Sequence, residues 1–324
     1  MQIDSSLTYA LVIFLILGVV LVNGATDAPN AISSAVSTRA LKMWQACLIC
    51  GVCNFASVIL FCVFSHEVAD TVFSLVEFKT ESGALIAILS TMITTILFGV
   101  VTSRLGMPSS ESHAMLSSLF GASFLFGNKS ILGGLGKIIL YAVLSCVLAF
   151  LVSLLFSLLL KKHRFRSKAW LILSTALISA MHGAQDGQKL VGIMLLFMVK
   201  SYTPPHFFNK YVVILLVALF MLLGSLICGK RIIQSLGENT IKLDIHTGLV
   251  SDLGGFLTLV LCSLLGMPIS TGNVKTFSLI GTALAEGKGV NKKTVAGVII
   301  TSIATVPVCF IFSLVLTKLF CYFL

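Results

Sequence analysis

The stretch "LGMPSSESHAMLSSLFGASF" (105–124) decides the fold, because a copy of it returns later in the chain as "LGMPISTGNVKTFSLIGTAL" (265–284). The two copies share Leu-Gly-Met-Pro-x-Ser at the start and Gly-Ala or Gly-Thr near the end. Self-similarity at a fixed spacing indicates that one structural unit occurs twice in the chain.

A second pair of motifs supports the duplication. "NGATDAPNAISSA" (23–35) and "HGAQDGQKLVGIM" (182–194) share Gly-Ala-x-Asp. The Asp lies 81 residues before the Pro of the next motif in the first copy and 82 residues before it in the second. Two motif pairs in the same order at nearly the same separation predict a first repeat over 1–160, a basic loop over 161–168 and a second repeat over 169–324.

The composition is that of a membrane protein. Hydrophobic residues make up 57% of the chain and charged residues only 10%, whereas soluble domains carry about 25% charged residues. A helix needs about 20 apolar residues to cross a bilayer, and the alternation typical of barrel strands is absent. We therefore predict an all-α polytopic membrane protein with apolar stretches at Leu7–Val22, Met43–Ser65, Ala84–Ser103, Ile138–Leu160, Tyr211–Gly229 and Thr294–Thr317.

The net charge of +10 follows from membrane topology rather than from nucleic-acid binding. Five Lys or Arg residues lie in "KKHRFRSK" (161–168), between two apolar stretches. Such a segment is typical of a cytoplasmic loop under the positive-inside rule. The Cys47, Cys50 and Cys53 run lies inside an apolar stretch with no fourth ligand nearby, so we interpret it as helix packing and expect no metal site there.

Charges between the spans favour repeats of inverted topology. Segment 66–81 carries four acidic residues and one Lys, which predicts an external loop. Its counterpart near 225–241 begins with Lys230 and Arg231, which predicts an internal loop. Inverted repeats in carriers place the substrate site near the midplane, where helices are interrupted.

All four motif copies have the composition of helix interruptions. The first pair combines Gly with a carboxylate, and the second pair places Gly and Pro before Ser or Thr. Pro is favoured at the first helical position, and hydroxyl residues cap helix starts. Because the start of a helix presents free N–H groups to anions, two facing starts would form a cage for a small tetrahedral oxyanion.

These motifs resemble those of the inorganic phosphate transporter (PiT) family, Gly-x-Asn-Asp-x-x-Asn and Gly-x-Pro-x-Ser-Thr-Thr-His. They read "GATDAPN" and "GAQDGQK", and "GMPSSESH" and "GMPISTGN", in this chain. The Gly-Gln-Lys ending is most similar to bacterial low-affinity Pit carriers. The resemblance implies a multi-pass carrier of a bacterial plasma membrane that imports phosphate by symport with a cation through alternating access. It also implies hairpin helices that meet near the membrane midplane and a homodimer as the assembly. We expect no enzyme activity and no bound cofactor.

The resemblance also assigns residues by position. Hydroxyl side chains would hold the phosphate oxygens: Ser109, Ser110, Ser112, Ser270 and Thr271. Carboxylate and amide side chains would lie at the cation sites: Asp27, Asn30, Asp186 and Gln188.

This chain departs from the family pattern in both motifs. Glu111 replaces a hydroxyl residue, so it must be protonated, paired with a cation or turned away from phosphate. Lys189 stands where the first repeat has Asn30. Our hypothesis is that the Lys189 ammonium fills a sodium position and offsets phosphate charge. A proton, or a metal carried with phosphate, would then be the coupling ion rather than sodium, with Glu111 as a coupling group and His113 as a candidate proton relay.

Several alternatives remain open at this point. Asp27 and Asp186 are interpretable as helix caps, and Asp186 with Lys189 as a purely structural ion pair. Sulfate has the same shape and charge as the phosphate dianion, so an oxyanion permease is the nearest alternative function. An intramembrane hydrolase using Ser110 or Ser112 with His113, an ion channel and a structural protein are more distant ones.

Overall fold

The computed structural model describes residues 5–323 except 65, 66, 77, 79, 108, 128–130, 201–208, 229 and 234–239. The described residues form twelve helices and no strand, which confirms the all-α prediction. The first half contains α1 (Ser5–Ser37), α2 (Met43–Phe64), α3 (Glu67–Ser74), α4 (Glu81–Leu105), α5 (Glu111–Phe124) and α6 (Ile131–Leu160). The second half contains α7 (Lys168–Lys200), α8 (Lys210–Leu226), α9 (Lys230–Ile233), α10 (Ile245–Leu264), α11 (Thr271–Glu286) and α12 (Lys292–Phe323).

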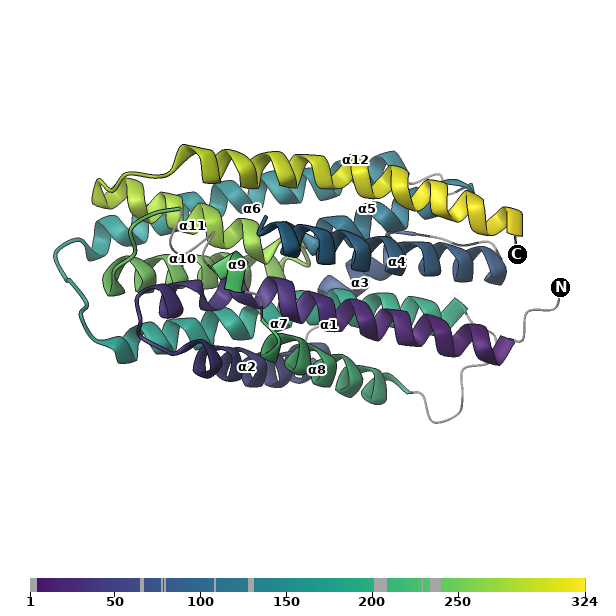
Figure 1. The fold of residues 1–324 in the computed structure, drawn as a ribbon, viewed down its shortest axis with the longest axis horizontal. Helices are drawn as coiled ribbons and strands as arrows, with labels where there is room; N and C mark the ends of the chain where they lie inside the picture. Colours follow the sequence, from purple (N-terminus) through teal and green to yellow (C-terminus); the bar gives the residue numbers. More distant parts are fainter. Residues whose placement is uncertain are drawn as a thin grey trace.

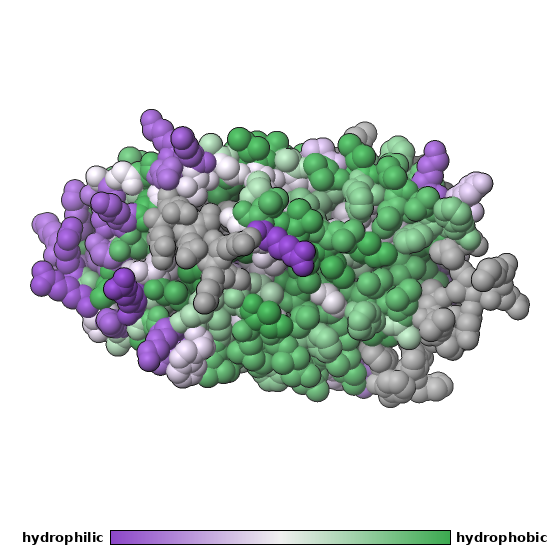
Figure 2. Space-filling model, in the orientation of Figure 1, coloured by the Kyte–Doolittle hydropathy of each residue, from purple (hydrophilic) through white to green (hydrophobic). Residues whose placement is uncertain are grey.

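Figure 2 shows a broad apolar surface over the middle of the molecule, with hydrophilic residues gathered chiefly at its left end. Six helices are long and apolar enough to cross a bilayer: α1, α2, α4, α6, α10 and α12. The chain is therefore a multi-pass integral membrane protein. The predicted stretch Tyr211–Gly229 forms the shorter α8, and the span formed by α10 was not among the predicted apolar stretches.

Two helical hairpins enter the molecule from opposite ends. Hairpin α4–α5 and hairpin α10–α11 each turn back near the middle (Figure 1). The second helix of each has only 14 or 16 residues, about 21–24 Å of helix, which is too short to cross a hydrocarbon core of about 30 Å. The returning helix of each hairpin packs mainly against a helix of the other half: α5 against α12, and α11 against α6.

Neither copy of the Gly-Ala-x-Asp motif interrupts its helix, contrary to the sequence prediction. Both α1 and α7 run unbroken for 33 residues through Asp27 and Asp186. In α1 the Asp27 carboxylate accepts hydrogen bonds from the amides of Asn23 and Asn30, each at 3.2 Å and each one turn away on the same helix. The helix itself therefore satisfies the carboxylate, and no break is needed to expose a partner.

The glycines of these motifs serve close helix packing instead of a break. A Cβ on Gly183 would lie 2.4 Å from the Ser57 hydroxyl of α2, and one on Gly187 would lie 2.5 Å from Val58. Small residues at such crossings let membrane helices approach closely. Pro29 remains inside α1, where it removes one backbone hydrogen bond without ending the helix.

Segment 66–81, which its charges predicted as an external loop, is not wholly a loop. It contains α3, which packs against the middle of α7 (Figure 1). Val68 and Ala69 are buried there, and the Val68 N–H donates to the Gln188 side-chain oxygen at 3.1 Å. The segment therefore packs on α7 through the apolar face of α3, although its acidic residues predicted a loop. The side chains of Lys230 and Arg231, on the predicted counterpart, lie outside the described residues.

The crossing of α11 over α6 depends on a glycine. A Cβ on Gly281 would lie 2.3 Å from the Phe150 carbonyl oxygen, which is backbone and has little room to move. We expect Gly281→Ala to lower the free energy of unfolding by about 1–3 kcal/mol, measured by thermal unfolding in detergent. Gly136→Ala on α6, where a Cβ meets nothing within 4 Å, is the matched control. Equal stability of the two variants would contradict this packing.

Candidate functional site

Both short hairpin helices begin inside the protein with a serine cap. The Ser110 hydroxyl accepts from the His113 N–H at 3.2 Å, and the Ser270 hydroxyl accepts from the Asn273 N–H at 3.3 Å. The connection before each of these helices contains a glycine with positive φ, Gly106 at 68° and Gly266 at 62°. Glycine adopts this conformation without steric cost. The predicted capped starts of the second motif pair are thus confirmed.

The proline of this motif does not occupy the first helical position. Pro268 precedes the cap Ser270 by two residues, because α11 begins only at Thr271. Pro108 lies outside the described residues. Ser109 lies in the connection before α5, where its hydroxyl lies 2.7 Å from that of Thr102 on α4.

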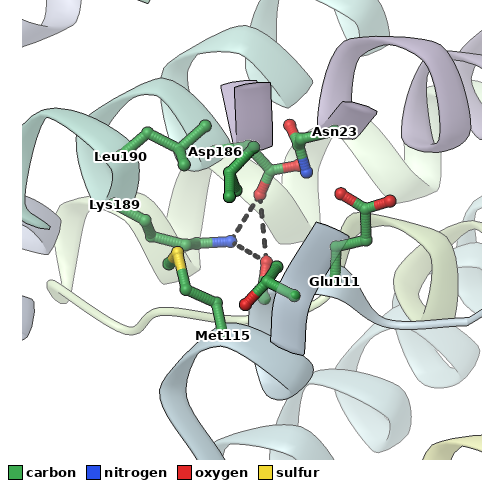
Figure 3. Close-up of a pocket in the computed structure, with 9 residues that line it drawn as sticks. Asn23, Glu111, Met115, Asp186, Lys189 and Leu190 are labelled. Carbon is green, nitrogen blue, oxygen red and sulfur yellow. Dashed lines mark hydrogen bonds and ion pairs between the residues drawn. The ribbon is translucent and has the colours of Figure 1, made fainter. Parts of the chain in front are cut away.

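The Lys189 ammonium lies between the two hairpin starts. It donates to the Asp186 carboxylate at 2.5 Å and to the Ser112 hydroxyl of α5 at 2.7 Å. On the other side it donates to the Ile269 carbonyl, just before α11, at 2.5 Å. Lys189 is 1% exposed. This one buried cation joins α7 to α5 (Figure 3) and to the approach to α11.

Asp186 collects donors from the same three elements. Besides Lys189, its carboxylate accepts from Ser112 at 3.2 Å and from Thr271, the first residue of α11, at 3.4 Å. The His182 Nε2, one turn earlier on α7, lies 3.2 Å from its second oxygen. Asp186 and Lys189 are therefore neither at a helix break nor capping a helix start. They form the buried centre at which both hairpins meet.

A group of side chains that could bind a cation adjoins this centre. One side-chain atom each from Asp27, His182 and Asp186 lies within 4.8 Å of the others, and all three residues are buried. Carboxylate oxygens with an imidazole nitrogen suit a small metal cation, and a proton also fits between them. Asn30 connects this group to α11, since a Cβ on Gly272 would lie 2.8 Å from the Asn30 amide nitrogen.

Glu111 lies across a small cavity from Lys189. Its carboxyl contacts the Thr26 hydroxyl of α1 and points toward Asn23, whereas the Lys189 ammonium points toward Asp186 (Figure 3). The second Glu111 oxygen has no hydrogen-bond partner among the described residues. The cavity measures about 10 Å³, close to the smallest volume that admits a water molecule, so this conformation is closed around its centre.

Two predicted site residues lie apart from the centre. Gln188 points toward α3, where its oxygen accepts from Val68. His113 is buried and lines an apolar groove between α6 and α12 together with Asn273. Its Nε2 has no hydrogen-bond partner among the described residues.

Sequence reasoning did not assign three residues that the structure places at the site. His182 bridges Asp186 and Asn54, whose side-chain oxygen lies 3.1 Å from its Nδ1. Thr26 contacts Glu111 from α1. His182 and Asn54 are polar residues within apolar helices, a signal that would have marked them. Thr26 had no such signal, because its partner is 85 residues away.

Comparison with known protein families gives two matches along the chain. The pattern of the "Phosphate transporter family" matches residues 23–171 and again residues 165–313. One family pattern found twice confirms the internal duplication.

Individual proteins with similar sequences cover nearly the whole chain. A "Probable low-affinity inorganic phosphate transporter" of Bacillus subtilis (strain 168) is 29% identical over 301 residues, covering 89% of both chains. A protein of the same description from Rhizobium meliloti (strain 1021) is 29% identical over 340 residues, covering 99% of this chain and 98% of its own. A solved structure, "The sodium-dependent phosphate transporter", matches with a TM-score of 0.85 at 20% identity, over 98% of this chain and 100% of that one. At this identity the match shows a shared fold.

Proposed function

The chain belongs to the phosphate transporter family, and we propose that it is a secondary carrier that imports inorganic phosphate together with a cation. The observation that carries this proposal is the buried Lys189 ammonium between the starts of α5 and α11. A cation flanked by two helix starts and their hydroxyls suits a small dianion. The family and its relatives are transporters, and the chain is a multi-pass protein of a bacterial plasma membrane.

We propose that phosphate displaces Asp186 from Lys189. In the closed conformation the carboxylate occupies the donors that an oxyanion would use: the Lys189 ammonium and the hydroxyls of Ser112 and Thr271. Phosphate entering the cavity would take over these three donors, and Ser109, Ser110 and Ser270 lie beside the same helix starts. The released Asp186 carboxylate then needs a new partner, which links phosphate binding to cation binding.

The proposed binding site of the co-transported cation lies beside the displaced carboxylate. Asp27, Asn30 and His182 lie beside Asp186, so we propose that a proton or a divalent metal bound there neutralises the two carboxylates when phosphate holds Lys189. Lys189 already supplies a fixed positive charge, which favours a proton or a metal–phosphate complex over sodium. Glu111 is the second candidate proton carrier, because a buried carboxylate without a cation is costly. His113 faces a groove instead of this site, and Gln188 faces α3.

We propose alternating access by two inverted repeats. The first helices of the halves, α1 and α7, run in opposite directions, and so do the last helices, α6 and α12 (Figure 1). Opposed hairpins meeting at one centre would let each end of the molecule open in turn. We further propose that the 161–168 end is cytoplasmic and that the carrier assembles as a homodimer, as the resemblance to the family implies.

Uptake of labelled phosphate into proteoliposomes tests the proposed function. We expect saturable uptake that accumulates phosphate above its outside concentration and resists excess sulfate, with liposomes lacking protein as the control. Equal competition by sulfate would instead identify a general oxyanion permease. Flux that neither saturates nor accumulates phosphate would identify a channel and overturn the proposal.

A further inference from the structure

A second buried ion pair lies outside the central site. The Lys275 ammonium of α11 contacts the Asp252 carboxylate of α10 and donates to the Ser34 hydroxyl of α1 at 2.6 Å. Ser34 in turn donates to Asp252 at 2.9 Å. Ser174 and Thr175 of α7 donate to the other Asp252 oxygen, each at 3.3 Å. Lys275 and Asp252 are 1% and 0% exposed.

This cluster repeats the chemistry of the central site. Each site consists of a Lys–Asp ion pair surrounded by hydroxyl side chains from neighbouring helices: Ser112 and Thr271 around Lys189, and Ser34, Ser174 and Thr175 around Lys275. Each is completely buried. Ionisable groups inside a membrane protein are costly and mark substrate or ion pathways.

The cluster lies between the central site and the end that holds segment 161–168. Along α1, Ser34 follows Asn30 by one turn, and along α11 Lys275 follows Gly272, which abuts Asn30. The same two helices therefore border both sites. Asp252 is the eighth residue of α10, about 10 Å from the start of that helix, which lies at the 161–168 end (Figure 1).

An arginine-lined pocket opens beyond the cluster at this end. Its volume is about 520 Å³, and it is lined by Arg39, Arg164 and Arg166 together with Ser37 of α1, whose hydroxyl has no partner among the described residues. Asp244 also borders it. Although partial burial raises the pKa of Asp244, hydrogen bonds from Lys288 and Thr247 lower it to about 2. This carboxylate is therefore engaged by Lys288, at 2.8 Å, instead of the arginines.

The duplication does not account for the second ion pair. Counted at the offset of 160 residues that separates Leu105 from Leu265, the counterparts of Lys275 and Asp252 are Met115 and Met92. Both methionines are buried in the apolar core, and Met115 also lines the small cavity beside Lys189. The same architecture is thus built without charges at this position. Replacing a buried ion pair by apolar residues is often neutral or stabilising, so stability alone does not explain the pair.

We propose that Lys275 is a second phosphate-binding station, through which the anion passes between the Lys189 site and the arginine-lined pocket. Asp252 neutralises the ammonium when the station is empty, as Asp186 does for Lys189. This inference rests on the proposed function, because it presupposes that phosphate leaves the central site toward the 161–168 end.

The test replaces the pair by the residues of the other half, Lys275→Met with Asp252→Met. We expect a folded protein of equal or higher melting temperature whose binding of labelled phosphate in detergent stays within about twofold of wild type. Its uptake into proteoliposomes should fall at least about tenfold, a barrier change of about 1.4 kcal/mol. Lys293→Met, at an exposed position, controls for loss of a positive charge.

Phosphate uptake by the double variant at the wild-type rate would overturn the proposal of a second phosphate-binding station. So would loss of phosphate binding with the fold intact, because the pair would then only support the central site. If the double variant does not fold, Lys275→Gln with Asp252→Asn keeps hydrogen-bonding groups without charge, and the same outcomes decide. Wild-type protein that does not accumulate phosphate would refute the proposed function itself, which separates the two failures.

Discussion

Replacing Asp186 by Asn is expected to reduce phosphate uptake at least about 100-fold. The Asp186 carboxylate accepts hydrogen bonds from Lys189, Ser112 and Thr271. The His182 Nε2 lies 3.2 Å from it. Without the carboxylate charge, Lys189 remains a buried cation whose acceptors, among them the Ser112 hydroxyl and the Ile269 carbonyl, are all neutral. Removing one partner of a buried pair leaves an uncompensated charge, and a 100-fold loss of uptake corresponds to about 2.7 kcal/mol in the transport barrier.

The way in which Asp186→Asn fails distinguishes transport from structure. Phosphate no longer competes with a carboxylate for Lys189, so we expect equilibrium phosphate binding in detergent to be retained while uptake is lost. Asp70→Asn, on the exposed face of α3, is the matched control and should transport normally. Near-normal uptake by Asp186→Asn, in protein with an unchanged melting temperature, would mean that the carboxylate only anchors Lys189.

Replacing Lys189 by Asn should make uptake depend on sodium. The change restores the residue type that Asn30 provides in the first half and removes the fixed ammonium beside Asp27 and Asp186. Two buried carboxylates then need an external cation, because burial of an unpaired charge is unfavourable. We expect sodium to stimulate uptake by the variant at least about tenfold and to leave the wild type unaffected, with a weaker apparent phosphate affinity in the variant.

Measurement of initial uptake rates across a series of sodium concentrations checks this expectation. Lys318→Asn, an exposed position on α12, controls for the change in net charge. Uptake by Lys189→Asn that stays indifferent to sodium and is otherwise normal would refute the assignment of Lys189 to a cation position. Lys189 would then be only the structural partner of Asp186.

Local sequence signals predicted the parts of the site that local structure determines. The Gly-Met-Pro-x-Ser motifs identified both hairpin starts, because a positive-φ glycine and a capping serine act within a few residues. The spacing of Asp186 and Lys189 indicated an ion pair within one turn, and the structure contains it. The apolar stretches located most of the membrane spans in the same way.

Features that depend on distant partners were not predictable from the sequence. The Gly-Ala-x-Asp motifs predicted helix breaks, but their glycines accommodate α2 and α8 against unbroken helices. The acidic segment containing α3 predicted a loop, although its apolar face packs on α7. Asp252 and Lys275 were overlooked because they are 23 residues apart, and their connection through Ser34 exists only in the folded protein.

The most direct test of the account is uptake of labelled phosphate by the wild-type protein under three imposed gradients: sodium, proton, and proton with external magnesium. The fixed ammonium of Lys189 predicts uptake that a proton gradient drives and that sodium leaves unchanged, with stimulation by magnesium if a metal–phosphate complex is the substrate. Uptake driven by sodium and indifferent to the proton gradient would contradict the account. It would show that Asp27 and Asn30 belong to a working sodium site and that Lys189 does not replace one.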